Sequence, residues 1–131
     1  MRALVHLLLA AALLAPQAAT AQSWRHVTRS TGTQSGPSET YIDTTRFTRD
    51  GDRVQYWQRS VLERERGKGA GRYNEMIVHM EADCRALSYR PMRIIAAFNG
   101  SEVASDTVHV EPVAVAPGTA GDRILRAACA L

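Results

Sequence analysis

The sequence is poor in cysteine, with only Cys84 and Cys129 among its 131 residues. Neither belongs to a CxxC pair or lies beside a pair of histidines, so both lack the ligand spacing of a zinc site. Neither lies near the N-terminus, where a lipid anchor needs a cysteine directly after the cleaved leader. We therefore expect no metal centre, no cofactor and no lipid anchor.

An excess of one charge and a long apolar run are also missing. The chain has 16 Lys and Arg against 13 Asp and Glu, a formal net charge of +3. A nucleic-acid binder identified by charge has a much stronger basic excess, so we expect no nucleic-acid partner. The longest apolar stretch, 3–15, is shorter than the roughly 20 residues that cross a bilayer. It therefore predicts no transmembrane anchor.

The first 21 residues have the layout of a secretory signal peptide. Arg2 gives a basic start, the apolar stretch follows, and Ala19-Thr20-Ala21 offers the small residues that signal peptidase accepts. Cleavage after Ala21 would leave one domain, 22–131, and the loss of Arg2 would lower the formal charge from +3 to +2. We expect an exported protein, in the periplasm first, with the cell surface or the medium as alternatives.

An exported protein with two cysteines is expected to pair them, because its compartment is oxidising. Cys84–Cys129 is the single intramolecular bridge that two cysteines allow. A ring of this size should stabilise the fold by about 4 kcal/mol if loop-closure entropy dominates.

The residues after the leader favour strands. Turn signals occur at Asp50-Gly51 and Asn99-Gly100, since these residues tolerate the positive φ of tight hairpins. Segments 29–39 and 64–72 are expected as loops and 44–52 as a turn. The expected strands are 23–28, 39–43, 53–63, 72–84, 89–98 and 102–110.

Two segments show which faces are buried. In 72–84, alternate residues from Met76 to Cys84 are apolar and those between are polar, with Ile77 as the exception. Near the C-terminus, Thr119 can cap a helix whose apolar stripe includes Cys129. The bridge would then clamp this helix over the sheet. The predicted core is Met76, Val78, Met80, Ile94, Phe98, Ile124 and Leu125.

These patterns predict an α+β fold. One antiparallel β-sheet of about six strands should pack against a C-terminal α-helix, tied to it by the disulfide.

Short motifs follow one another along nearly the whole mature chain. They are Trp24, Tyr41-Ile42-Asp43, Asp50-Gly51-Asp52-Arg53-Val54 with Trp57, Tyr73-Asn74, Glu81-Ala82-Asp83-Cys84, Tyr89-Arg90, Pro112-Val113, Pro117-Gly118-Thr119 and Cys129. Their order and spacing resemble the surface-adhesin protein E-like family of small exported bacterial domains. The resemblance implies an antiparallel sheet with a disulfide-tied C-terminal helix. It also implies an adhesin that binds host extracellular-matrix proteins.

Catalytic signatures are absent from the sequence. No serine has a nucleophile-elbow pattern, so we expect no enzyme. His79, Glu81 and Asp83 would share one strand face, and His109 and Glu111 lie further along. These residues could ligate a metal, but alternation alone predicts solvated polar residues there, which is the interpretation we favour.

The strongest candidate for a partner contact is the segment 64–72. It carries Arg64, Arg66, Lys68 and Arg72 between glycines, and it could present a basic patch to an acidic protein. Trp24, Tyr56 and Trp57 are candidates for an aromatic contact surface or for the core. Two function classes follow: a noncatalytic binding module similar to the adhesin, and a soluble periplasmic factor that supports the cell envelope or a periplasmic complex.

Overall fold

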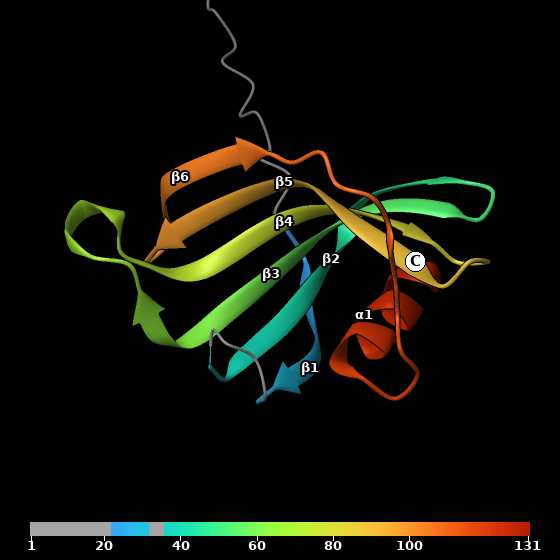
Figure 1. The fold of residues 1–131 in the computed structure, drawn as a ribbon, viewed down its shortest axis with the longest axis horizontal. Helices are drawn as coiled ribbons and strands as arrows, with labels where there is room; N and C mark the ends of the chain where they lie inside the picture. Colours follow the sequence, from blue (N-terminus) through green and yellow to red (C-terminus); the bar gives the residue numbers. More distant parts are fainter. Residues whose placement is uncertain (1–21, 32–35) are drawn as a thin grey trace, which may run out of the picture.

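The computed structural model describes residues 22–31 and 36–131. The expected signal peptide, 1–21, lies outside the described residues. The strands form one antiparallel sheet in which each is hydrogen-bonded to the next along the chain, from β1 to β6, and β7 pairs with β5 (Figure 1). The elements are β1 Trp24–Ser30, β2 Ser38–Asp50, β3 Arg53–Arg66, the 3-10 turn η1 Gly69–Gly71, β4 Tyr73–Asp83, β5 Ser88–Phe98, β6 Ser101–Thr107, β7 Val113–Ala114 and α1 Ala120–Cys129.

The predicted α+β fold is confirmed, with six main strands and the C-terminal helix. Both hairpin signals are correct: Gly51 has φ 58°, and Asn99 and Gly100 have φ 47° and 85°. These positive values are the conformations for which Asn and Gly are suited.

The expected turn over 44–52 is wrong. Strand β2 continues through this segment to Asp50 and pairs with β3, and only Gly51 and Asp52 form the turn. The pairing is interrupted between Ile42 and Phe47. There the Asp43 carboxylate accepts the backbone N–H groups of Thr45 and Arg46, at 2.9 and 3.2 Å. A side chain replaces the neighbouring strand as hydrogen-bond partner, so the strand bulges and resumes.

Helix α1 packs against one face of the sheet, near one end of the strands (Figure 1). Its side chains Leu125 and Ala128 join a core with residues of β2, β3 and β4. Ile94 and Ile124 are half-buried against that core. The buried core residues are Ile42, Val54, Tyr56, Val78, Met80, Ala82, Leu125 and Ala128.

Met76 and Phe98 were predicted in this core but lie outside it. Both are only half-buried, and they lie toward the ends of β4 and β5 that α1 does not cover. Ile77, the exception to the alternation, pairs with Ile95 across β4 and β5 on the helix-free face. Two neighbouring isoleucines shield each other there, which explains an apolar residue on the polar face.

The N-terminus of α1 is capped as predicted. Thr119 Oγ accepts the backbone N–H of Asp122 at 3.2 Å, and the Asp122 carboxylate accepts the N–H of Gly118 at 2.9 Å. The hydrogen bond from Gly118, aided by the guanidinium of Arg126, lowers the pKa of Asp122 although burial opposes the shift. An ionised carboxylate in the first turn also favours the helix dipole.

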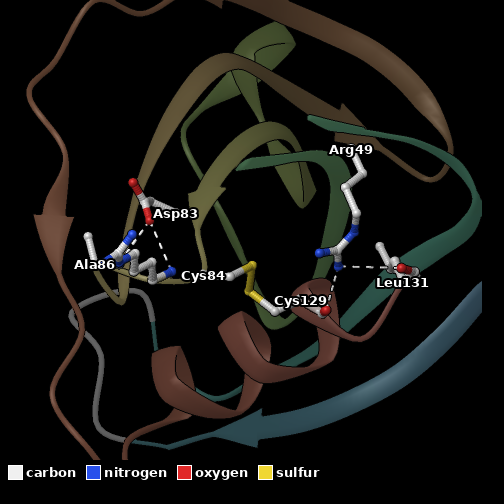
Figure 2. Close-up of a disulfide and its surroundings, with 7 residues drawn as sticks. Arg49, Asp83, Cys84, Ala86, Cys129 and Leu131 are labelled. Atoms are coloured by element: carbon white, nitrogen blue, oxygen red, sulfur yellow. Dashed lines mark hydrogen bonds between the residues drawn. A yellow bond between two sulfur atoms is a disulfide. The ribbon is translucent and has the colours of Figure 1, made fainter. Parts of the chain in front are cut away.

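The predicted disulfide joins Cys84, directly after β4, to Cys129 at the end of α1, with 5.8 Å between the Cα atoms (Figure 2). Arg49, near the C-terminal end of β2, donates to the carbonyl oxygens of Cys129 and Leu131 (Figure 2). The end of the helix is thus tied to β4 by a covalent bond and to β2 by an arginine. Among the described residues, no helix is long and apolar enough to span a bilayer.

Candidate functional site

The basic loop, 64–72, lies at the end of the sheet opposite α1 (Figure 1). Arg64 and Arg66 lie at the end of β3, which is longer than predicted, and Arg66 pairs with Tyr73 of β4. Lys68 precedes η1, and Arg72 follows it. Every residue of the loop is exposed. The structure therefore brings the four predicted cations into one exposed segment.

Arg72 contacts a carboxylate and an aromatic ring. Its Nη1 donates to Glu65 Oε1 at 3.3 Å, and its Cζ lies 4.9 Å from the centre of the Phe98 ring. A cation over an aromatic face is attracted by the ring quadrupole, so Phe98 helps to fix the base of the loop against the β5–β6 hairpin.

The loop turns on Gly67, which has φ +77°. A Cβ at this position would lie 2.4 Å from the carbonyl oxygen of Gly71, closer than any real contact. Only glycine fits such an approach of backbone to backbone. The glycines thus close a folded turn that displays the cations on a defined backbone.

The polar strand residues do not converge on one point. His79 stacks on Trp57, Glu81 binds Arg90 at 2.9 Å, and Asp83 accepts the backbone N–H groups that follow β4. Within 22–31 and 36–131, no group of three or more His, Cys, Asp or Glu side chains is placed to hold a metal ion. His109 and Glu111 lie in the segment after β6, beside a shallow depression of about 290 Å³ against β5.

The aromatic candidates lie on opposite faces of the sheet. Tyr56 is fully buried in the core, and burial raises the pKa of its hydroxyl. Trp57, the next residue, points to the helix-free face and stacks on His79 with ring centres 4.7 Å apart. The Arg46 guanidinium lies 5.1 Å from the Trp57 ring and 5.9 Å from Trp24. We call Trp24, Arg46, Trp57 and His79 the outer-face cluster.

Arg46 and its partner Asp43 were missed by the sequence reasoning. The segment that contains Arg46 was expected as a turn, so the arginine was not expected to lie beside two tryptophans. The available signal was Asp43 followed by Thr45, since an aspartate that accepts hydrogen bonds two and three residues later can nucleate a local bulge.

The electrostatics of the cluster favour a neutral imidazole. Burial lowers the pKa of His79, the nearby Arg46 cation lowers it further, and Glu81 partly opposes both effects. The lowered pKa favours the uncharged ring, which suits its stacking on Trp57 near the Arg46 cation.

Comparison with known proteins agrees with this architecture. A family model described as Surface-adhesin protein E matches residues 24–130. The chain belongs to this family. The match spans every strand and the helix, and it indicates an adhesin-like, noncatalytic and exported protein. No curated protein and no solved structure gives a match.

This surface-adhesin protein E domain has two chemically different surface features. The basic loop is a prominent, charged turn, suited to an acidic surface on a protein. The outer-face cluster is aromatic, with one arginine held by Asp43. The disulfide agrees with export, because such bonds persist in oxidising compartments.

Proposed function

We propose that this surface-adhesin protein E domain is a noncatalytic binding module that contacts an acidic region of a protein, such as a host extracellular-matrix protein, through the basic loop. The observation that carries the proposal is the position of Arg64, Arg66, Lys68 and Arg72. All four are exposed on one folded turn at the end of the sheet away from the helix and the disulfide.

Charge supports the loop as the contact. Its four cations are opposed within 64–72 only by Glu65, so its local charge is strongly positive although the whole chain is nearly balanced. Clustered charge of one sign speeds diffusional encounter with a complementary surface and makes the association depend on salt.

The cations of the loop should also contribute little to the stability of the fold. Exposed ion pairs contribute on average less than about 1 kcal/mol to stability. Neutralising the cations should therefore remove binding while the protein stays folded, so function and stability can be separated by experiment.

The test compares three proteins for binding to a panel of purified matrix proteins at low and high salt. They are the wild type, a variant with Arg64, Arg66, Lys68 and Arg72 replaced by Gln, and a matched control with the exposed Arg25, Arg53, Arg85 and Arg93 replaced by Gln. Both variants lose four positive charges. We expect the loop variant to bind at least tenfold more weakly with a flatter salt response, and the control to bind nearly as the wild type does.

Equal weakening in both variants would show that net charge matters and the loop does not. Unchanged affinity in the loop variant would remove the loop from the account. If the wild type binds no matrix protein, the proposal fails and the soluble periplasmic role becomes the better hypothesis.

A further inference from the structure

The helix-free face of the sheet holds a second candidate site, separate from the basic loop. A shallow depression of about 350 Å³ lies beside the outer-face cluster. This volume is at the lower end of the roughly 300–1,000 Å³ found for ligand sites, and it suits a ligand of one or two rings. Its lining includes side chains of β2, β3 and β4: Arg46, Thr48, Gln55, Trp57 and His79.

Arg46 is held in place by a carboxylate below it. Its Nε donates to Asp43 Oδ2 at 2.6 Å, and Asp43 Oδ1 accepts the Thr45 hydroxyl at 2.7 Å and the two backbone N–H groups of the bulge. Asp43 is completely buried. Burial alone would raise the pKa of this carboxyl, but the hydrogen bonds from Thr45 and Arg46 lower it to about 2.

The rest of the Arg46 guanidinium is available. Across 22–31 and 36–131, its only side-chain hydrogen bond is the one from Nε, so the edge formed by Nη1 and Nη2 has no protein acceptor. That edge is the planar fork that binds a carboxylate through two parallel hydrogen bonds. With the Trp24 and Trp57 ring centres 5.9 and 5.1 Å from Cζ and Nε bound to Asp43, the fork is preorganised, which lowers the entropy lost on binding.

The groups around the fork suit a hydroxylated ring. The Gln55 side-chain N–H donates to Glu81 at 3.3 Å, and its carbonyl oxygen remains available. Within the described ranges, the Thr48 hydroxyl and the Trp57 indole N–H have no protein hydrogen-bond partner. The lining thus combines a carbonyl acceptor, a hydroxyl and an indole donor with a single carboxylate-binding edge. A ligand with one carboxylate and several hydroxyl groups matches this pattern.

Two other anions fit less well. Where the depression lies over β3 and β4, the backbone groups beneath it are engaged in strand pairing, so a peptide lying over these strands would gain few backbone partners for its amides. A highly sulfated polymer requires many cations, and this depression contains one. A sugar acid needs one cation and side-chain partners only.

We propose that the depression beside Arg46 binds a sugar acid, a uronic or sialic acid residue of a glycan. The carboxylate binds the Nη1–Nη2 edge of Arg46, and the ring hydroxyls bind Gln55, Thr48 and the Trp57 indole N–H. The site lies about seven residues, roughly 23 Å, from the basic loop along β3. It goes beyond the proposed protein contact and holds whether or not the loop binds a matrix protein.

The experiment is a titration of the ¹⁵N-labelled mature domain, followed by amide and indole NMR shifts. The probes are methyl glucuronide and sialyllactose, each beside its neutral counterpart, methyl glucoside or lactose. An acetylated glutamate amide is the peptide probe. We expect at least one sugar acid to shift the signals of residues 45–48 and 55 and the Trp57 indole. The neutral sugars and the glutamate amide should bind at least tenfold more weakly.

Arg46→Lys retains the charge beside Asp43 but loses the fork, and it should weaken sugar-acid binding at least tenfold. Gln55→Ala should weaken sugar-acid binding severalfold. This variant tests the site if Arg46→Lys does not fold. Arg90→Lys is the matched control, because Arg90 lies on the same face with its guanidinium bound to Glu81. It should bind as the wild type does.

Four results would overturn the proposal. They are no shifts with either sugar acid up to tens of millimolar, equal binding of the neutral sugars, equal or tighter binding of the glutamate amide, and shifts confined to other residues. Unchanged affinity in both Arg46→Lys and Gln55→Ala would overturn it as well. The basic-loop variant leaves this site intact. Its loss of matrix-protein binding is therefore a separate outcome, and it neither causes nor explains any of these results.

Discussion

The two ends of the sheet differ in what covers them. Helix α1 contacts β1, β2, β3 and β4 and lies near one end of these strands (Figure 1). The helix therefore shields only one end, the covered end, which holds the apolar core and the disulfide. The opposite, open end carries the basic loop and the β5–β6 hairpin.

This difference separates stability from recognition. At the covered end, changes remove buried area or a covalent bond, and the free energy of unfolding should fall sharply. At the open end, changes to the exposed side chains of the basic loop should mainly alter binding. The predictions below test that contrast, from the largest expected effect to the smallest.

Removal of the disulfide should have the largest effect. Replacing Cys84 and Cys129 by Ala should lower the free energy of unfolding by about 4 kcal/mol. The bridge joins residues 45 positions apart, and without it the unfolded chain regains the conformational entropy of that loop. Urea unfolding of the double variant and of the reduced wild type measures it. The unfolded, unreduced wild type should also show no free thiol toward a labelling reagent, and labelling at both positions would exclude the bridge.

Truncation in the core should come next. Leu125→Ala should cost about 2–4 kcal/mol, because Leu125 is fully packed between helix and sheet. Leu87→Ala is the matched control, since Leu87 is 46% exposed, and it should cost less than about 0.5 kcal/mol. Equal losses in the two variants would mean that α1 is not docked as described.

Acid should weaken the β2 bulge that Asp43 holds. The pKa of Asp43 is lowered from 3.8 to about 2 in the folded state, so its ionised form stabilises the fold above about pH 4. That contribution, on the order of 2 kcal/mol, should be lost as the pH falls from about 4 to about 2. Urea unfolding across this range measures the loss. The Asp43→Asn variant should show a shallower fall, and a parallel fall would exclude Asp43 as the cause.

The smallest effect should come from the open end. Phe98→Ala removes the ring beneath Arg72, and a double-mutant cycle with Arg72→Gln should give a coupling of about 0.5–1 kcal/mol. Denaturant midpoints of the four proteins supply the cycle. A coupling near zero would show that the contact does not order the loop, and a Phe98→Ala loss as large as that of Leu125→Ala would contradict the comparison of the two ends.

Local patterns predicted the fold well where each residue reports on its own surroundings. The alternation in 72–84 correctly placed Val78 and Met80 in the core, and Thr119 was correctly identified as the cap of the helix. The hairpins followed from Asp50-Gly51 and Asn99-Gly100, whose backbone preferences are intrinsic. The single possible cysteine pair fixed the bridge.

Features that depend on distant partners were not predictable from local patterns. The length of β2 is determined by its pairing with β3, so polar residues that suggest a turn continue as strand. Met76 and Phe98 have apolar side chains on the helix side, but α1 lies near the other end of the strands and does not cover them. The outer-face cluster requires the Asp43 bulge to bring Arg46 beside Trp57, and no short-range pattern indicates that contact.

Native-state hydrogen exchange tests the separation of the two ends most directly. Amides of Tyr56, Met80 and Leu125 should exchange only through global unfolding and report one common free energy. Amides of 66–72 should exchange through local openings, about a hundredfold faster or more. Equal protection of the core and the basic loop would contradict the account, and so would rapid exchange throughout α1 while the core amides of β3 and β4 remain protected.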